Sequence, residues 1–212
     1  MTTQLALANM ALSHIGARDN IPSLAENSVE ARTVSLWIDP SRRQTLEAYN
    51  WNFAKKRAAL VADADDPPEG EWGWRFVYPA DCLKAREIQN PGVPYIPHAL
   101  MSHRVYAQPD AMPFEVELSP DGTRKTILTE MEEPVLIYTA NITDLELFSA
   151  LAVNALSYAL AHNIAFKLTG KMQLADRMFQ LFLNSIRMAA MHDGNEQVER
   201  APREAEVIRG RM

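Results

Sequence analysis

Trp51-Asn52-Phe53-Ala54 is the stretch that divides this chain into two kinds of sequence. An amphipathic segment, residues 27–49, precedes it, and Lys55-Lys56-Arg57 and an acidic loop follow it. Its two aromatic residues alternate with smaller side chains, a period that predicts a half-buried strand. Neither the stretch nor its flanks place a nucleophile beside a base. The stretch therefore predicts a joint between a helical half and a β-rich half, with both aromatic side chains as core anchors.

The composition is that of an ordinary globular protein. The chain has 212 residues, of which 47% are hydrophobic and 23% are charged, enough to bury a substantial core. The formal net charge is −6 and the pI is near 5.4, so the basic surface of a nucleic-acid-binding domain is not expected. The single cysteine, Cys82, excludes an internal disulfide and a cysteine-based zinc site.

One segment is long enough to cross a membrane. Residues 147–166 carry no charged side chain, which is about the length of a spanning helix. Much of this apolar content is alanine, and five polar residues are spread through the segment. Those groups are costly in lipid, so the segment predicts a buried helix. The chain start lacks the basic region of a signal peptide, and no membrane partner is expected.

Proline placement predicts the domain organisation. Ten of the thirteen prolines lie between Pro67 and Pro134, and proline breaks helix interiors. The predicted fold class is α+β, mainly α, with a bundle of four or five helices around a small, proline-rich, antiparallel insertion. We expect residues 1–50 and 141–193 to form the bundle, residues 51–140 the β-rich region and residues 194–212 an extended C-terminal tail.

Apolar residues that recur every three or four positions predict the helical segments. These segments span about residues 3–17, 27–49, 143–166 and 171–192. Asn27 and Thr143 can cap the second and third helices, each with a glutamate three residues later. Gly16 and Gly194 follow the ends of the first and last helices. Inside the second segment, Asp39-Pro40 predicts a kink or a fresh helix start.

The middle of the chain contains the strand patterns. Residues 114–118 alternate between apolar and acidic side chains, and Ser119-Pro120-Asp121-Gly122 has the residues of a type I turn. Thr126-Ile127-Leu128 returns from that turn, which predicts a hairpin. Residues 134–140 predict another strand, buried on both faces. Residues 89–113 contain five prolines and predict a long functional or contact loop, or a locally disordered segment.

Two pairs of residues are candidate contacts with other subunits. Trp72 and Trp74 are spaced as on one face of a strand, which suits either core packing or an interface anchor. Arg42 and Arg43 suit either a solvated helix face or a salt bridge to a subunit or partner.

Patterns that indicate catalysis or cofactor binding are weak. Gly170-Lys171 lacks the frame of a phosphate-binding loop, and the five histidines show no metalloprotease spacing. His162 is interpreted as a satisfied core residue. Three aspartates are interpreted as caps or turn formers, namely Asp39, Asp81 and Asp144. No catalytic residue, cofactor or metal ligand is predicted.

The order of these elements resembles a known family. The matching pieces are Ala11-Leu12 with Ile15-Gly16, Ile21-Pro22-Ser23-Leu24, Ala31 through Arg42-Arg43, Leu46 through Trp51-Asn52-Phe53-Ala54, Arg57-Ala58-Ala59-Leu60, Tyr78-Pro79-Ala80-Asp81-Cys82-Leu83, Leu136-Ile137-Tyr138, Ile142-Thr143-Asp144 and the helix Leu151 to Leu160. Over about residues 4–193, they resemble the tail tubular protein A family, the head-to-tail adaptors of short-tailed bacteriophages. Relatives occur in prophages and gene transfer agents.

The resemblance implies a structural virion protein and no enzyme. Such adaptors form rings, usually of twelve copies, between the portal protein and the tail nozzle or next tail protein. They extend the channel through which genomic DNA passes without specific binding, and an acidic ring would repel DNA phosphates. Assembly would take place in the host cytoplasm. The tail residues expected to dock on the portal are Val198, Arg200, Arg203, Val207, Ile208 and Arg211.

Two alternatives come from other functional classes. A tail-associated hydrolase acting on cell-wall glycan could use Glu115 and Glu117, which share a strand face at a spacing compatible with a retaining mechanism. A nucleic-acid-binding module is the other alternative, and the charge balance opposes it.

Overall fold

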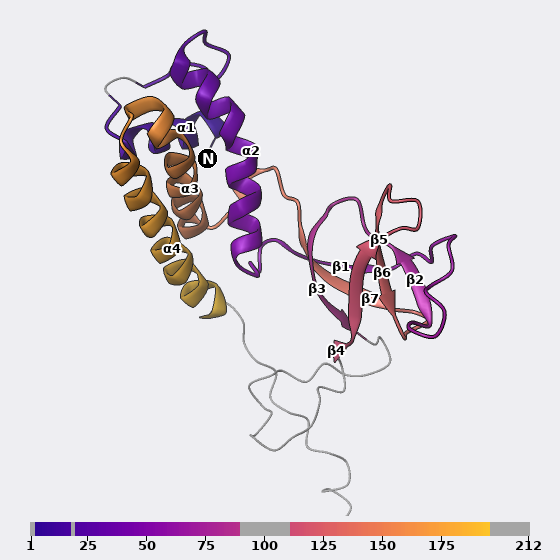
Figure 1. Ribbon diagram of the computed structural model, residues 1–212. Coiled ribbons are helices and arrows are strands. Elements are labelled where there is room, and N and C mark those ends of the chain that lie inside the picture. The colour runs from indigo at the N-terminus through magenta and orange to yellow at the C-terminus, as the bar shows by residue number, and fades with distance from the viewer. Residues whose placement is uncertain (1–2, 18–19, 90–110, 196–212) are drawn as a thin grey trace, which may run out of the picture. The chain divides into compact units, whose positions relative to one another are not determined.

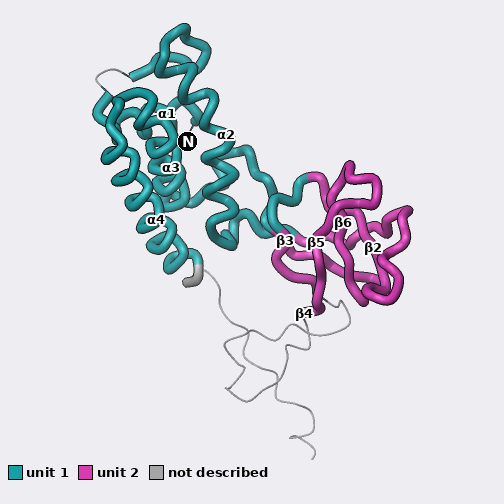
Figure 2. Tube along the Cα trace, in the orientation of Figure 1, with its two compact units in different colours: residues 1–56, 81–84, 139–196 teal, residues 57–80, 85–138, 197–212 magenta. Residues whose placement is uncertain are grey.

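The computed structural model describes residues 3–17, 20–89 and 111–195 (Figure 1). Within them the chain is a mixed α/β protein of the α+β class, with four α-helices and two small sheets. The chain divides into two compact units (Figure 2). A helical unit comprises residues 1–56, 81–84 and 139–196, and a β unit comprises residues 57–80 and 85–138. Residues 51–56, 81–84 and 139–140, expected in the β-rich region, belong to the helical unit.

The first two helices begin at side-chain caps. Helix α1 spans Gln4–His14, and its cap Thr3 accepts a hydrogen bond from the Ala6 amide at 3.1 Å. At its end the amides of Gly16 and Ala17 donate to the carbonyls of Ser13 and Leu12. This is a Schellman motif, which requires the positive φ of Gly16, 74°. The predicted stop at Gly16 is confirmed.

Helix α2 spans Val29–Ala48 without interruption. Its cap is Ser28 and not Asn27, because the Ser28 hydroxyl accepts the Ala31 amide at 3.2 Å. Pro40 lies inside the helix, so the alternative of a fresh helix start there is wrong. Proline has no amide hydrogen, so Pro40 donates no hydrogen bond within the helix.

The last two helices are also bounded differently from the prediction. A short 3-10 helix, η2, spans Leu145–Leu147 with Asp144 as its cap, as expected of that aspartate. Helix α3 spans Ala150–Thr169, with Ser149 as its N-cap and Gly170, at φ 69°, as its C-cap. The assignment of Thr143 as its cap is therefore wrong. Helix α4 spans Met172–Asn195 and includes Gly194, so that glycine is not the stop.

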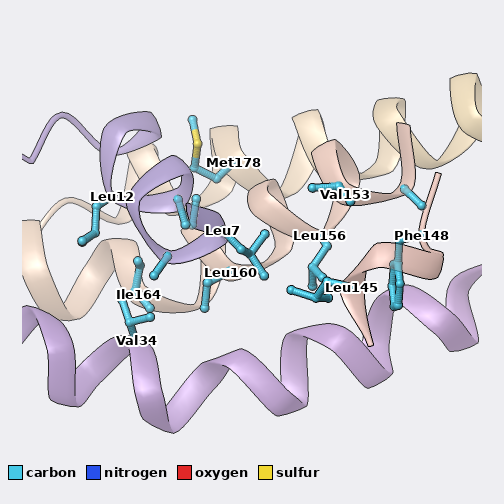
Figure 3. Packing of buried hydrophobic residues seen from close by; sticks show 14 of the residues in the cluster. Leu7, Leu12, Val34, Leu145, Phe148, Val153, Leu156, Leu160, Ile164 and Met178 are labelled. Atoms are coloured by element: carbon cyan, nitrogen blue, oxygen red, sulfur yellow. The ribbon is translucent and has the colours of Figure 1, made fainter. Parts of the chain in front are cut away.

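Helix α3 is the centre of the helical unit. It packs against α1, α2 and α4, and Figure 1 shows it between α2 and α4. Five alanines of α3 are almost completely buried, which lets the neighbouring helices approach closely: Ala152, Ala155, Ala159, Ala161 and Ala165. Larger side chains from all four helices fill the rest of the core, including Leu7, Val34, Leu156, Ile164 and Met178 (Figure 3). No helix in the described part of the chain is both long and apolar enough to span a membrane.

The stretch 51–54 is not a strand. Trp51 is completely buried in the helical core, and its indole N–H donates to the Thr45 carbonyl at 2.8 Å. The Asn52 amide donates to the Asp193 carboxylate at 3.0 Å. These bonds hold the backbone of residues 51–54 in a turn against the helices. Strand β1, Lys55–Ala59, therefore begins at the residue after Ala54. The expectation that Trp51 is a core anchor is confirmed.

Over the described ranges, seven strands form the two sheets. They are β1, β2 (Trp74–Val77), β3 (Cys82–Gln89), β4 (Ala111–Met112), β5 (Phe114–Leu118), β6 (Lys125–Thr129) and β7 (Val135–Ala140). One sheet has the order β1-β7-β3-β4 and the other β2-β6-β5. The second sheet is antiparallel, with Glu115 opposite Leu128 and Glu117 opposite Thr126. The predicted hairpin is confirmed, since the Gly122 amide donates to the Ser119 carbonyl at 2.8 Å. The burial of β7 on both faces is also confirmed.

Candidate interaction surfaces

Two histidines of the helical unit, His14 and His162, have structural partners. His162 Nδ1 lies 2.9 Å from the Ala175 carbonyl, which confirms it as a satisfied residue of the helical unit. His14 Nε2 lies 3.0 Å from Ser157 Oγ and stacks on Tyr158. Ser157 is completely buried, so no substrate can reach it. Burial lowers the pKa of His14. The described residues contain no group of three or more histidine, cysteine or acidic residues placed to hold a metal ion.

The two glutamates of β5 differ in their surroundings. Glu117 forms an ion pair with Arg75 at 2.7 Å, and the Arg75 side chain is only 4% exposed. Arg75 also donates to Thr126 Oγ1 and to the Asp66 carbonyl. Glu115 is exposed. Glu117 therefore neutralises a buried guanidinium and holds β5 to the rest of the sheet.

A second ion-pair cluster holds the hairpin of the β unit to the acidic loop. Arg124 Nη2 lies 2.6 Å from Asp63 Oδ1 and 2.9 Å from Asp65 Oδ2. The Asp63 side chain is 1% exposed. The hydrogen bond from Arg124 holds the pKa of Asp63 below its ordinary value. Within the turn, hydrogen bonds from Ser119 and Thr123 lower the pKa of Asp121 to about 2.

Because of the ion pairs of Arg124 with Asp63 and Asp65, we expect the stability of the β unit to fall at acid pH. Because the folded pKa of Asp63 is lowered, its stabilisation is complete above the ordinary carboxyl pKa and is lost as pH falls through the folded pKa. We expect Asp63→Asn to unfold at lower urea concentration at pH 7 and to show a weaker loss of stability between about pH 5 and pH 2. Urea unfolding at a series of pH values measures both effects. Glu69→Gln, a change at an exposed residue of the same loop, should match the parent, and an unchanged pH profile for Asp63→Asn would contradict the assignment.

Arg42 and Arg43 have different environments. The Arg42 side chain is 7% exposed and pairs with Asp39 at 2.5 Å. It also donates to Asn141 Oδ1 at 2.8 Å and to the Ile142 carbonyl at 2.6 Å. The interpretation of Arg42 as part of a solvated face is wrong, and Asp39 is an ion-pair partner inside a helix and not a cap. Arg43 is 52% exposed and pairs with the other Asp39 oxygen, so its contact with a partner stays a prediction.

The two tryptophans before and within β2 differ in their exposure. Trp74 is 40% exposed and begins β2, while Trp72 precedes the strand and is half-buried. The prediction that Trp74 packs in the core under the sheet is therefore wrong. The interface role of Trp72 and Trp74 stays a prediction.

Helix α2 presents an apolar surface that the sequence reasoning missed. Leu36 is 69% exposed, Val29 50% and Trp37 37%. Val29 and Leu36 lie two turns apart on one helix face. We call Val29, Leu36 and Trp37 the α2 surface. In the sequence, Leu36 and Trp37 lie outside the apolar stripe of Ala31, Val34 and Ile38. This offset is the pattern that could have indicated a second apolar face on the helix.

A second apolar surface lies near the end of α4. Met188 and Met191, one helical turn apart, are 58% and 69% exposed. We call this pair the α4 surface. In this turn of α4 the buried residue is the neighbouring Ala189, which is 2% exposed.

The portal-docking residues expected in the tail lie outside the described residues, as does most of the loop predicted at residues 89–113. Comparison of the chain with protein-family models and with curated proteins finds no significant match.

Proposed function

We propose that this protein is a structural subunit that assembles with copies of itself into the ring of a bacteriophage head-to-tail adaptor. In this proposal the helical unit is the bundle of the subunit, and the proline-rich β region is an insertion that adds contacts. The observation that carries the proposal is the pair of exposed apolar surfaces on α2 and α4. Both helices pack on α3 (Figure 1).

Two unlike surfaces favour one type of assembly. When a surface of one copy binds a different surface of the next, the contact is heterologous and closes into a ring if the rotation allows it. Trp37 and Leu36 supply a large aromatic and aliphatic contact, and methionine adapts to irregular partners. We propose that the α2 surface of one copy binds the α4 surface of its neighbour, with Arg43 at the rim.

The resemblance supplies the remaining parts of the proposal. The ring contains twelve copies, binds the portal protein on one side and the tail nozzle or next tail protein on the other, and surrounds the path of the genomic DNA. The subunit is then part of the virion and has no catalytic role. The hydrolase alternative gains no support from the described residues, because Glu117 is committed to Arg75.

Charge substitutions on the two surfaces test the contact. We expect Leu36→Glu and Met191→Glu each to abolish rings, because each buries an unpaired carboxylate in an apolar contact, at a cost of about 2 kcal/mol or more per junction. Electron microscopy and light scattering of the purified protein, over a range of concentrations, measure ring formation. Leu147→Glu, at a 56% exposed leucine outside both surfaces, is the matched control.

Mixing the variants identifies the type of contact. Leu36→Glu leaves the α4 surface intact and Met191→Glu leaves the α2 surface intact, so an equimolar mixture should form heterodimers and no larger species. If each variant still forms rings, or if the parent protein stays monomeric at every concentration and with its portal protein, the proposal is wrong.

A further inference from the structure

Among the described residues, the β2-β6-β5 sheet has one covered edge and one edge without a partner strand. On the outer side of β2, the Asp63 amide donates to the Arg75 carbonyl and the Val77 amide donates to the Val61 carbonyl, both at 2.9 Å. On the outer side of β5, no strand of the described residues pairs with it. An open edge offers a row of backbone donors and acceptors to another strand.

The hairpin determines which groups face the open edge. The Ser119 amide donates to the Arg124 carbonyl at 2.8 Å, so this is a hydrogen-bonded pair. Such pairs alternate along an antiparallel ladder, which makes Glu117 with Thr126 and Glu115 with Leu128 the next ones. On the other side of β6, the Tyr78 amide donates to the Lys125 carbonyl. Lys125 therefore faces β2, as expected when the next residue, Thr126, faces β5. The amides and carbonyls of three residues therefore point away from the sheet: Phe114, Val116 and Leu118.

The side chains along this edge specify the kind of strand that fits. Val116 and Leu118 are 40% and 61% exposed and lie on one face of the sheet. Glu115 is exposed on the opposite face, and Glu117 there is already paired with Arg75. An added strand would therefore need apolar side chains on one face and a basic side chain near Glu115 on the other.

One segment of the chain has this pattern. Ile208-Arg209-Gly210-Arg211-Met212 alternates apolar or small residues with arginine and contains no acidic residue. It ends a stretch of seventeen residues, 196–212, beyond the described part of α4, which can reach up to about 55 Å when extended. Residues 90–110 are a poorer candidate because they contain four prolines, which cannot donate to a ladder.

We propose that residues 208–212 of a neighbouring copy add a strand to the outer edge of β5. Ile208 and Met212 pack beside Val116 and Leu118, and the two arginines lie on the side of Glu115. The inference rests on the proposed function in one respect, since it requires copies in contact. It assigns Ile208 and Arg211 to the ring itself and leaves Val198, Arg200 and Arg203 for the portal.

Hydrogen–deuterium exchange can test this strand in trans. A ¹⁵N-labelled chain that ends at Ala205 is mixed with unlabelled full-length protein, and exchange is read at single residues by mass spectrometry with electron-transfer fragmentation. We expect the Phe114, Val116 and Leu118 amides of the labelled chain to exchange about ten-fold more slowly than without the full-length protein. The Glu115 and Glu117 amides, which face β6, should not change.

Light scattering of the same samples separates this inference from the proposed function. If the copies associate and the three amides stay unprotected, the strand proposal is wrong while the ring proposal stands. If the full-length protein shows protection at every dilution and the mixture shows none, the segment binds its own chain and the proposal is overturned. If no copies associate at all, the proposed function fails.

Charge reversal provides a second variant set. The single variant Glu115→Arg should remove most of the ten-fold protection. The double variant Arg209→Glu with Arg211→Glu should do the same. Combining all three changes should restore the protection. A role of Glu115 in folding alone would give no such rescue. Val116→Pro removes an amide that faces outward, so it should block the added strand and leave the β5–β6 ladder intact, as checked by exchange at Glu115 and Glu117.

Discussion

Replacing Trp51 with alanine is expected to destabilise the helical unit by about 3–5 kcal/mol, the cost of truncating a large buried aromatic residue. Trp51 is completely buried, and its ring contacts Tyr49 and Phe53 at centroid distances of 5.1 and 5.4 Å. The variant also leaves the Thr45 carbonyl without the indole donor. Urea unfolding followed by circular dichroism measures the change.

Two further variants separate the contributions at this position. Trp51→Phe keeps most of the packing and removes the indole hydrogen bond, so it should cost less than the alanine variant. Trp74→Ala, at a 40% exposed tryptophan, should change the free energy of unfolding by about 1 kcal/mol or less. Equal losses for Trp51→Ala and Trp74→Ala would contradict the assignment of Trp51 as the anchor. Any assembly defect of Trp51→Ala should disappear when folding is restored at lower temperature.

Replacing Arg42 with methionine is expected to cost about 1–3 kcal/mol, because it leaves the partly buried acceptors of the guanidinium without a donor. The guanidinium bonds Asp39, Asn141 and the Ile142 carbonyl, which joins α2 to the segment after β7. Methionine keeps the unbranched apolar stem of the side chain and removes the guanidinium, so the loss mainly reports the polar contacts. Chemical denaturation measures it.

Arg43→Met is the matched control for Arg42. Arg43 is 52% exposed and shares the same aspartate, so its loss should cost less than about 1 kcal/mol. The hydrogen bond from Arg42 is the main cause of the lowered pKa of Asp39, so an NMR titration of Arg42→Met should show that pKa rising towards its ordinary value. If Arg42 and Arg43 variants behave alike, the buried role of Arg42 is wrong.

The elements that the sequence predicted well depend on neighbours along the chain. The Gly16 stop, the turn at residues 119–122 and the strand before Ala140 each follow from a local rule of backbone conformation or apolar period. The stretch 51–54 was mispredicted because its alternating pattern suited a strand, whereas contacts with Thr45 and Asp193 decided its backbone. A period of two does not reveal which distant partner a side chain meets.

By itself, the sequence determined the four helical segments, the hairpin, the proline-rich middle and the absence of a recognisable catalytic motif, because these follow from short-range propensities and residue types. Only the tertiary structure decided which charged and apolar residues are buried. Arg42 meets Asn141 and Arg124 meets Asp63, while Leu36 and Met191 stay exposed. The physical reason is that burial depends on elements far apart in the chain, and no local period records whether another helix covers a given face.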